Sequence, residues 1–191
     1  MILEEMDFTD FYAHIRSIFS EHFTKAETDE LMEYVDILSD ANFRCYKANM
    51  IVIDSRKKHE NNDKLIADME WVARSVGEYR VSSKARINKA ISKMRSGFIP
   101  NSAGLITWIS DDIVYSIGEM MDRLSIETIK REDFKVNNRP QHMTDSCQEL
   151  SDRVEKYLRA KLDEIDKKGF YECIHEQRTY DLEGIVEELA I

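Results

Sequence analysis

Helix breakers are scarce in this chain, and their scarcity is the strongest constraint on its fold. The 191 residues include only 6 Gly and 2 Pro, while Glu, Lys, Met, Leu and Ile are frequent. In a helix interior, Gly costs about 1 kcal/mol and Pro about 3 kcal/mol relative to Ala, so a chain with few of them can form long helices. Hydrophobic residues make up 42% of the sequence, enough for a core. We therefore predict an all-α fold, a single-domain bundle of about six helices over residues 1–191.

The most strongly patterned stretch runs from Ser110 to Asp133, and we predict a central buried helix there. Ser110 is followed by two aspartates, which is typical of a helix N-terminus. Apolar residues recur at helical spacing on one side, and two further isoleucines fall on the other side. The first set is Ile113, Ile117, Met120 and Leu124, and the second is Ile126 and Ile129. A helix that is apolar on two sides is expected to be buried on both.

Asp122 falls in the packed part of this predicted helix, with Glu119 and Arg123 next to it. A buried carboxylate is costly unless it is paired or hydrogen-bonded. Two interpretations are open. Asp122 forms a structural ion pair with a basic side chain, or it serves a functional site.

The same stretch resembles a known motif. Residues Gly118-Glu119-Met120-Met121-Asp122-Arg123-Leu124-Ser125-Ile126, continuing to Ile129-Lys130, are similar to G-x-x-x-D-R-L-S-I-x-x-I/L-K, found in an uncharacterised all-helical bacterial family, a domain of unknown function. Ala41-Asn42-Phe43 and the run from His175 to Asp181 fall in the order expected for that family. Tyr46 stands where the family shows Trp, and Asn49-Met50 stand where it shows an acidic pair. The resemblance implies an all-helical fold of unknown biochemical role.

Further helices are expected on both sides of the central one. Thr9 is the candidate cap of a helix over Phe8–Phe23, and Thr24 with Glu27 fits a capping box that opens a long helix. Asn42 lies in the apolar stripe of that long helix, either as a satisfied core amide or as a ligand contact. The other predicted helices are Leu65–Val76, with Trp71 in the core and Gly77 as its stop, then Lys84–Arg95, Thr144–Lys168 and Leu182–Leu189.

The predicted helix Lys84–Arg95 is purely basic within an acidic protein. Between Tyr79 and Ser110 the sequence has no Asp or Glu, but it has Arg86, Lys89 and Lys93 at helical spacing. One interpretation is that these cations pair with acidic helices of the same fold or of a partner subunit. The other is that they form a pocket for a phosphate-bearing ligand, because Arg and Lys supply charge and directional donors.

Composition narrows the class of protein. A formal net charge of −10 disfavours binding to duplex nucleic acid, which needs a basic surface. The three cysteines are far apart and odd in number, which indicates reduced thiols rather than a disulfide framework. No apolar run approaches the length of a membrane span, and the N-terminus is too acidic for a signal peptide. We therefore expect a cytoplasmic protein with neither a membrane nor a duplex nucleic acid as partner.

Signatures of catalysis are weak. The histidines do not make a metal set, and neither a nucleophile elbow nor a dinucleotide-binding fingerprint is present. Glu119 and Asp122 are spaced so that they could ligate Mg²⁺, as carboxylates do in all-helical nucleotide hydrolases.

The hypothesis from the sequence is a non-enzymatic, homo-oligomeric binding protein that holds a small phosphate-bearing ligand, a nucleotide or a sugar phosphate, in a basic pocket. No cofactor and no metal are expected. Two alternatives stay open: a metal-dependent all-α nucleotide hydrolase with Glu119 and Asp122 as Mg²⁺ ligands, and a structural or partner-binding oligomer. The predicted ligand-binding residues are Asn42, Arg86, Lys89, Lys93, Asp122 and Arg123.

Overall fold

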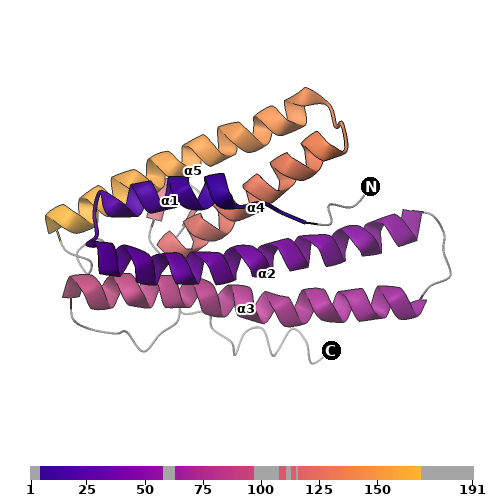
Figure 1. The fold of residues 1–191 in the computed structure, drawn as a ribbon, viewed down its shortest axis with the longest axis horizontal. Helices are drawn as coiled ribbons and strands as arrows, with labels where there is room; N and C mark the ends of the chain where they lie inside the picture. The colour runs from indigo at the N-terminus through magenta and orange to yellow at the C-terminus, as the bar shows by residue number, and fades with distance from the viewer. Residues whose placement is uncertain (1–4, 58–62, 97–107, 111–112, 115, 169–191) are drawn as a thin grey trace.

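A computed structural model describes residues 5–57, 63–96, 108–110, 113–114 and 116–168 of the chain. The described part contains five helices, which confirms the all-α class, although about six helices were predicted (Figure 1). A short antiparallel ribbon, in which Trp108 pairs with Val114 and Ser110 with Ile113, precedes the fourth helix. In chain order the elements are α1 (Thr9–Ser20), α2 (Lys25–Lys57), α3 (Asp63–Ser96), β1 (Trp108–Ser110), β2 (Ile113–Val114), α4 (Ile117–Val136) and α5 (Gln141–Lys168).

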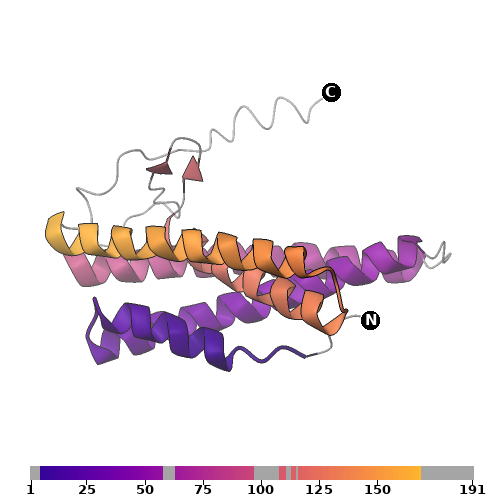
Figure 2. The same ribbon diagram turned by 90° about the horizontal axis from the view of Figure 1, so that it is seen from above.

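The helices form two antiparallel pairs with α1 packed beside them. The long helices α2 and α3 lie side by side along most of their length, and α4 and α5 form the second pair. Seen from above, α4 crosses the bundle obliquely (Figure 2), in contact with α2, α3 and α5. Because α4 packs against α2, α3 and α5, it is the central helix that the sequence predicts.

One hydrophobic core joins all five helices. Phe8, Phe11 and Phe19 recur at helical spacing in and next to α1, and all three are buried in this core. Met120, Met121 and Ile129 bring both sides of α4 into this core. The largest fully buried side chains are Ile15, Ile18, Phe19, Leu31, Leu38, Ile87, Ile91, Met120, Met121, Ile129, Leu158 and Leu162.

The first two helices begin with different local chemistry. Thr24 and Glu27 form the predicted capping box, because the Thr24 backbone N–H donates to Glu27 Oε2 at 2.8 Å and the Glu27 N–H donates to Thr24 Oγ1 at 3.4 Å. The predicted cap at Thr9 is wrong. Phe8 is the N-cap of α1, and the Thr9 N–H donates instead to Asp7 Oδ1 at 2.8 Å.

The predicted start of the central helix at Ser110 is also wrong, since Ser110 lies in β1 and the helix begins at Ile117. Ser116 is the N-cap. Its hydroxyl accepts from the Glu119 N–H at 3.2 Å, and the Glu119 carboxylate accepts from the Ser116 N–H at 2.9 Å. This complete capping box satisfies two N–H groups, and it outweighs the serine and aspartates further upstream.

The N-terminus of α4 approaches α3 very closely. The Gly118 N–H donates to Asn88 Oδ1 of α3 at 2.9 Å. A Cβ atom on Gly118 would lie 2.3 Å from the backbone oxygen of Lys84. Only glycine allows this approach, so the glycine of the motif has a packing role at the crossing of α3 and α4.

Two further predictions about α3 are wrong. Gly77 does not end a helix, because α3 runs without interruption from Asp63 to Ser96, and it merges the two helices predicted at Leu65–Val76 and Lys84–Arg95. Trp71 is not in the core, since 69% of it is exposed. Apolar residues occupy more of the circumference of this segment than α2 covers, and so Trp71 remains on the outer side of α3.

The last predicted helix, Leu182–Leu189, and the run His175–Asp181 lie outside the described residues. The helix predicted to begin at Thr144 begins at Gln141 and extends, as α5, to Lys168. Among the helices that the structure describes, none combines the length and the apolar character that crossing a membrane requires.

Candidate functional site

Two of the predicted site residues, Asn42 and Asp122, meet in a buried polar network between α2, α3 and α4. The Arg80 guanidinium of α3 contacts both oxygens of Asp122, with Nη2 at 3.0 Å from Oδ2 and 3.2 Å from Oδ1. The Asn42 amide donates to Ser125 Oγ at 2.5 Å and to the Asp122 carbonyl at 3.3 Å. These contacts fix α4 against both long helices. The ion-pair interpretation of Asp122 accounts for its burial, with Arg80 as the partner.

The neighbours of Asp122 face other partners. Arg123 Nε lies 3.2 Å from Glu127 Oε1, and Lys130 Nζ lies 3.0 Å from the same oxygen. Glu127 is almost fully buried, so it needs these two cations. The Glu119 carboxylate is engaged in the capping box of α4. Asp122 therefore pairs with Arg80 rather than with Arg123.

The arrangement of Glu119 and Asp122 bears on the metal-site alternative. Each carboxylate is held by a partner of the fold, the backbone of Ser116 for Glu119 and the Arg80 guanidinium for Asp122. In the part of the chain that the structure describes, no group of three or more His, Cys, Asp or Glu side chains is placed to hold a metal ion.

The other three predicted residues, Arg86, Lys89 and Lys93, lie on one side of the second half of α3. At 100° per residue they fall within a 60° sector, and we call them the cationic stripe. Arg86 and Lys93 are exposed and Lys89 is half-buried. Among the described residues none of the three forms an ion pair, whereas Arg80 and Arg95 of the same helix pair with Asp122 and with Asp166.

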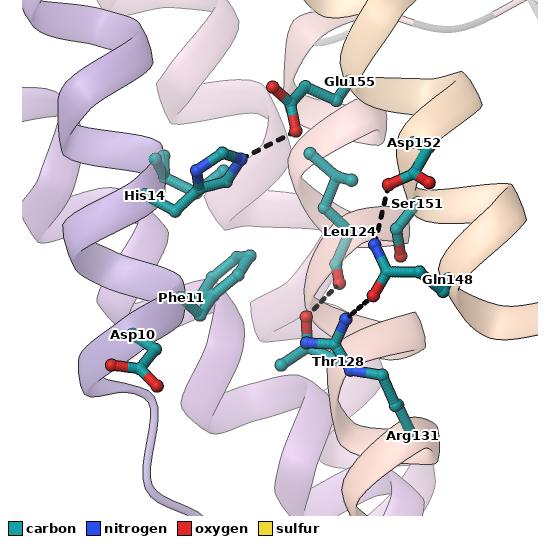
Figure 3. Close-up of a pocket in the computed structure, with 11 residues that line it drawn as sticks. Asp10, Phe11, His14, Leu124, Thr128, Arg131, Gln148, Ser151, Asp152 and Glu155 are labelled. Atoms are coloured by element: carbon teal, nitrogen blue, oxygen red, sulfur yellow. Dashed lines mark hydrogen bonds and ion pairs between the residues drawn. The ribbon is translucent and has the colours of Figure 1, made fainter. Parts of the chain in front are cut away.

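A separate pocket of about 260 Å³ opens between α1, α4 and α5 (Figure 3). His14 Nε2 lies 2.7 Å from Glu155 Oε2 across its upper part. On the opposite side Arg131 hydrogen-bonds Gln148, whose amide donates to Asp152 Oδ1 at 2.7 Å. The complete lining is Asp10, Phe11, His14, Ile15, Leu124, Thr128, Arg131, Gln148, Ser151, Asp152 and Glu155.

The electrostatics of the pocket are dominated by carboxylates. Partial burial raises the pKa of Glu155, but hydrogen bonds from Arg159 and His14 outweigh it and lower the pKa below the ordinary 4.5. Glu155 is therefore ionised at neutral pH, beside Asp10 and Asp152. Three of the side chains that line the pocket are carboxylates and one is an arginine, so this pocket suits a neutral or cationic polar molecule better than a phosphate.

The sequence does not reveal the pocket, and none of the six predicted ligand-binding residues lines it. Its polar side chains come from α1, α4 and α5, and the sequence pattern of each helix places them on its polar, solvent-facing side. Another missed residue is Arg80, the partner of Asp122. Its signal was present in the sequence, because Arg80 opens the window that has no acidic residue.

Comparison with known proteins adds no relative to this geometry. The chain matches no family model, and no curated protein and no solved structure gives a significant match. The resemblance of the α4 motif to an uncharacterised helical family stays a prediction. The functional argument therefore depends on the residues and contacts of this chain.

Proposed function

We propose that this chain is a non-enzymatic helical binding protein that holds a small phosphate-bearing ligand on the cationic stripe of α3. The observation that carries the proposal is the lack of any ion pair to Arg86, Lys89 and Lys93 among the described residues. By contrast, Arg16, Arg44, Arg131 and Arg159 on the other four helices each pair with a carboxylate.

Electrostatics favour an anion at this position. Neighbouring like charges on one side of a helix repel each other by a few tenths of a kcal/mol per pair. A phosphate relieves this repulsion, and it can accept directional hydrogen bonds from an arginine and charge-assisted bonds from two lysines. The acidic pocket between α1, α4 and α5 offers a phosphate no such surroundings.

A nucleotide fits the surroundings of the stripe better than a bare sugar phosphate. Tyr79, which is 66% exposed, lies on the same side of α3 as Arg86. Seven residues of helix separate the two side chains by about 10 Å. An exposed aromatic ring at that distance from the cations can stack with a base while the phosphates contact Arg86 and Lys89.

We further propose that the protein acts in the cytoplasm as a homo-oligomer. Cys45 and Cys147 are free thiols, which supports a reducing compartment. An exposed tryptophan on α3 supports self-association, because large exposed apolar side chains are enriched at protein interfaces.

The test of ligand binding is calorimetric titration of the full chain with ATP, glucose 6-phosphate and inorganic pyrophosphate at low ionic strength. Arg86→Glu and Lys89→Glu are each expected to weaken ATP binding about tenfold, which corresponds to about 1.4 kcal/mol. Lys156→Glu, an exposed charge reversal on α5, is the matched control and is expected to bind as the wild type does. Equal affinity in all four proteins would contradict the proposal, and so would turnover of ATP that Asp122→Ala abolishes without unfolding the chain.

A further inference from the structure

The outer side of the first half of α3 carries a seam of exposed side chains. Ala67, Trp71, Arg74, Glu78 and Val81 are all exposed. Trp71 and Val81 are 69% and 59% exposed, which is unusual for side chains of this size. Among the described helices in Figure 1, α3 lies at one edge, with α2 between it and α1. We call these five residues the α3 seam.

The spacing within the α3 seam is that of a coiled coil. Successive members are separated by four, three, four and three residues, the alternation that keeps one stripe facing a partner helix. The next position in this series, Ala85, is buried, so the accessible seam ends at Val81. The α3 seam therefore has the length and periodicity to pack against one further helix.

Four residues of the α3 seam, Trp71, Arg74, Glu78 and Val81, are self-complementary in order, whereas Ala67 falls opposite the buried Ala85. If a second α3 is laid antiparallel about a two-fold axis at Val76, Trp71 faces Val81 of the second copy. In the same alignment Arg74 faces Glu78 of the second copy, and the symmetry repeats both pairs. Apolar side chains thus meet apolar side chains, and each charge meets its opposite.

A parallel alignment has the opposite property. It places Arg74 beside Arg74 and Glu78 beside Glu78, and like charges in contact disfavour a complex. The pattern of charge therefore selects one orientation. A second copy of this chain supplies both the apolar side chains and the opposite charges in the antiparallel alignment.

We propose that the α3 seam is a homodimer interface in which two copies of α3 pack antiparallel about Val76. The contact is formed by Trp71 with Val81 and by Arg74 with Glu78 of the other copy. This inference rests on the proposed oligomeric state. The cationic stripe lies further along α3, and in the same alignment Arg86 and Lys89 fall opposite Ile66 and Asp63 of the second copy.

The experiment is sedimentation velocity of the full chain over a concentration series, with Arg74→Glu, Glu78→Arg and an equimolar mixture of the two variants. Each variant alone places like charges opposite each other, and its dimer Kd is expected to rise about tenfold or more. The mixture restores two opposite-charge pairs across the interface, and a heterodimer is expected to form with an affinity near that of the wild type. A pair within one helix cannot produce this rescue.

Arg153→Glu, an exposed reversal on α5, is the control and should dimerise as the wild type does. Circular dichroism checks that every variant keeps its helical content. A wild-type monomer at all concentrations would overturn both the proposed oligomeric state and the interface. An oligomer that persists unchanged in the single variants would overturn the interface alone, and loss of the dimer without rescue in the mixture would overturn the antiparallel pairing. ATP titration of the same variants separates these outcomes from failure of the anion site.

Discussion

Gly118 and Gly77 both lie inside helices, yet their surroundings differ. A Cβ atom on Gly118 would meet the backbone of Lys84 at 2.3 Å, whereas one on Gly77 would meet nothing within 4 Å. Gly118→Ala is expected to force α4 away from α3 and to lower the free energy of unfolding by about 1–3 kcal/mol. Gly77→Ala is expected to raise it by about 0.5–1 kcal/mol, because alanine is the better helix former.

Urea unfolding monitored by circular dichroism measures both glycine variants on one scale, and each is the control for the other. A Gly118→Ala protein as stable as the wild type would show that the crossing of α3 and α4 is looser than the structure has it.

Cys147 differs from an ordinary thiol in its acidity. Burial, followed by a hydrogen bond with Glu127, raises the pKa of Cys147 to about 11. Because the thiolate is the reactive form, Cys147 is expected to react with a disulfide reagent at about pH 8 roughly a hundredfold more slowly in the folded chain than after unfolding. The rate should rise as the pH approaches 11 while the chain stays folded.

Mass spectrometry of the labelled peptides follows Cys147 separately, with half-buried Cys45 as the internal comparison. Fast labelling of Cys147 in the native protein would contradict the buried environment.

At the scale of the elements, the Arg80–Asp122 pair determines how α4 sits on α3. Asp122 is 8% exposed, and its removal would leave the half-buried Arg80 without its partner. Asp122→Ala is therefore expected to lower the free energy of unfolding by about 1–3 kcal/mol. Asp40→Ala removes the partner of Arg44 in a well-exposed pair on α2, and it is expected to change stability by about 0.5 kcal/mol or less.

Denaturant unfolding of the two aspartate variants gives the comparison directly. If they lose the same stability, the network around Asp122 has no special role in docking α4. If only Asp122→Ala is destabilised, Asp122 has a structural role in its motif, which is to hold α4 against α3.

Local patterns predict the helices well where their ends carry complete signals. The capping box at Thr24 and Glu27 is an example, because both partners lie within four residues. The start of α4 was misplaced because a second box, at Ser116 and Glu119, competes with the serine and aspartates upstream. The box at Ser116 and Glu119 is complete, and the close contact of Gly118 with α3, which no local pattern contains, adds to it. Gly77 likewise matches a helix stop locally, although α3 continues through it and packs against α2.

At the scale of the whole molecule, the predicted site separates into three parts, of which Arg123 is one, since it pairs with Glu127. Asn42 and Asp122, which are 80 residues apart in the chain, meet in the network that joins α2, α3 and α4. Arg86, Lys89 and Lys93 lie on the outer side of α3. The sequence pattern singles out both groups as candidate site residues. Which group becomes buried depends on how helices that are distant in the chain cross. The pocket between α1, α4 and α5 was missed for the same reason, since it exists only once the three helices are assembled (Figure 3).

The folded molecule also gathers positive charge on one part of its surface. The chain has a net charge of −10, yet the second half of α3 presents the cationic stripe. The α3 seam lies nearer the other end of the same helix. We infer that α3 carries two surfaces, one for an anion and one for a second copy of the chain.

The most direct test of the central claim, that the cationic stripe holds a phosphate-bearing ligand, is a native mass spectrum of the chain purified from its own host. The spectrum is taken before and after denaturation, for the wild type and for the triple variant Arg86→Glu, Lys89→Glu, Lys93→Glu. The account predicts an additional small mass that contains phosphate, is released on denaturation, and is missing from the triple variant. A wild-type spectrum with the mass of the bare chain, or the same retained mass in both proteins, would contradict it.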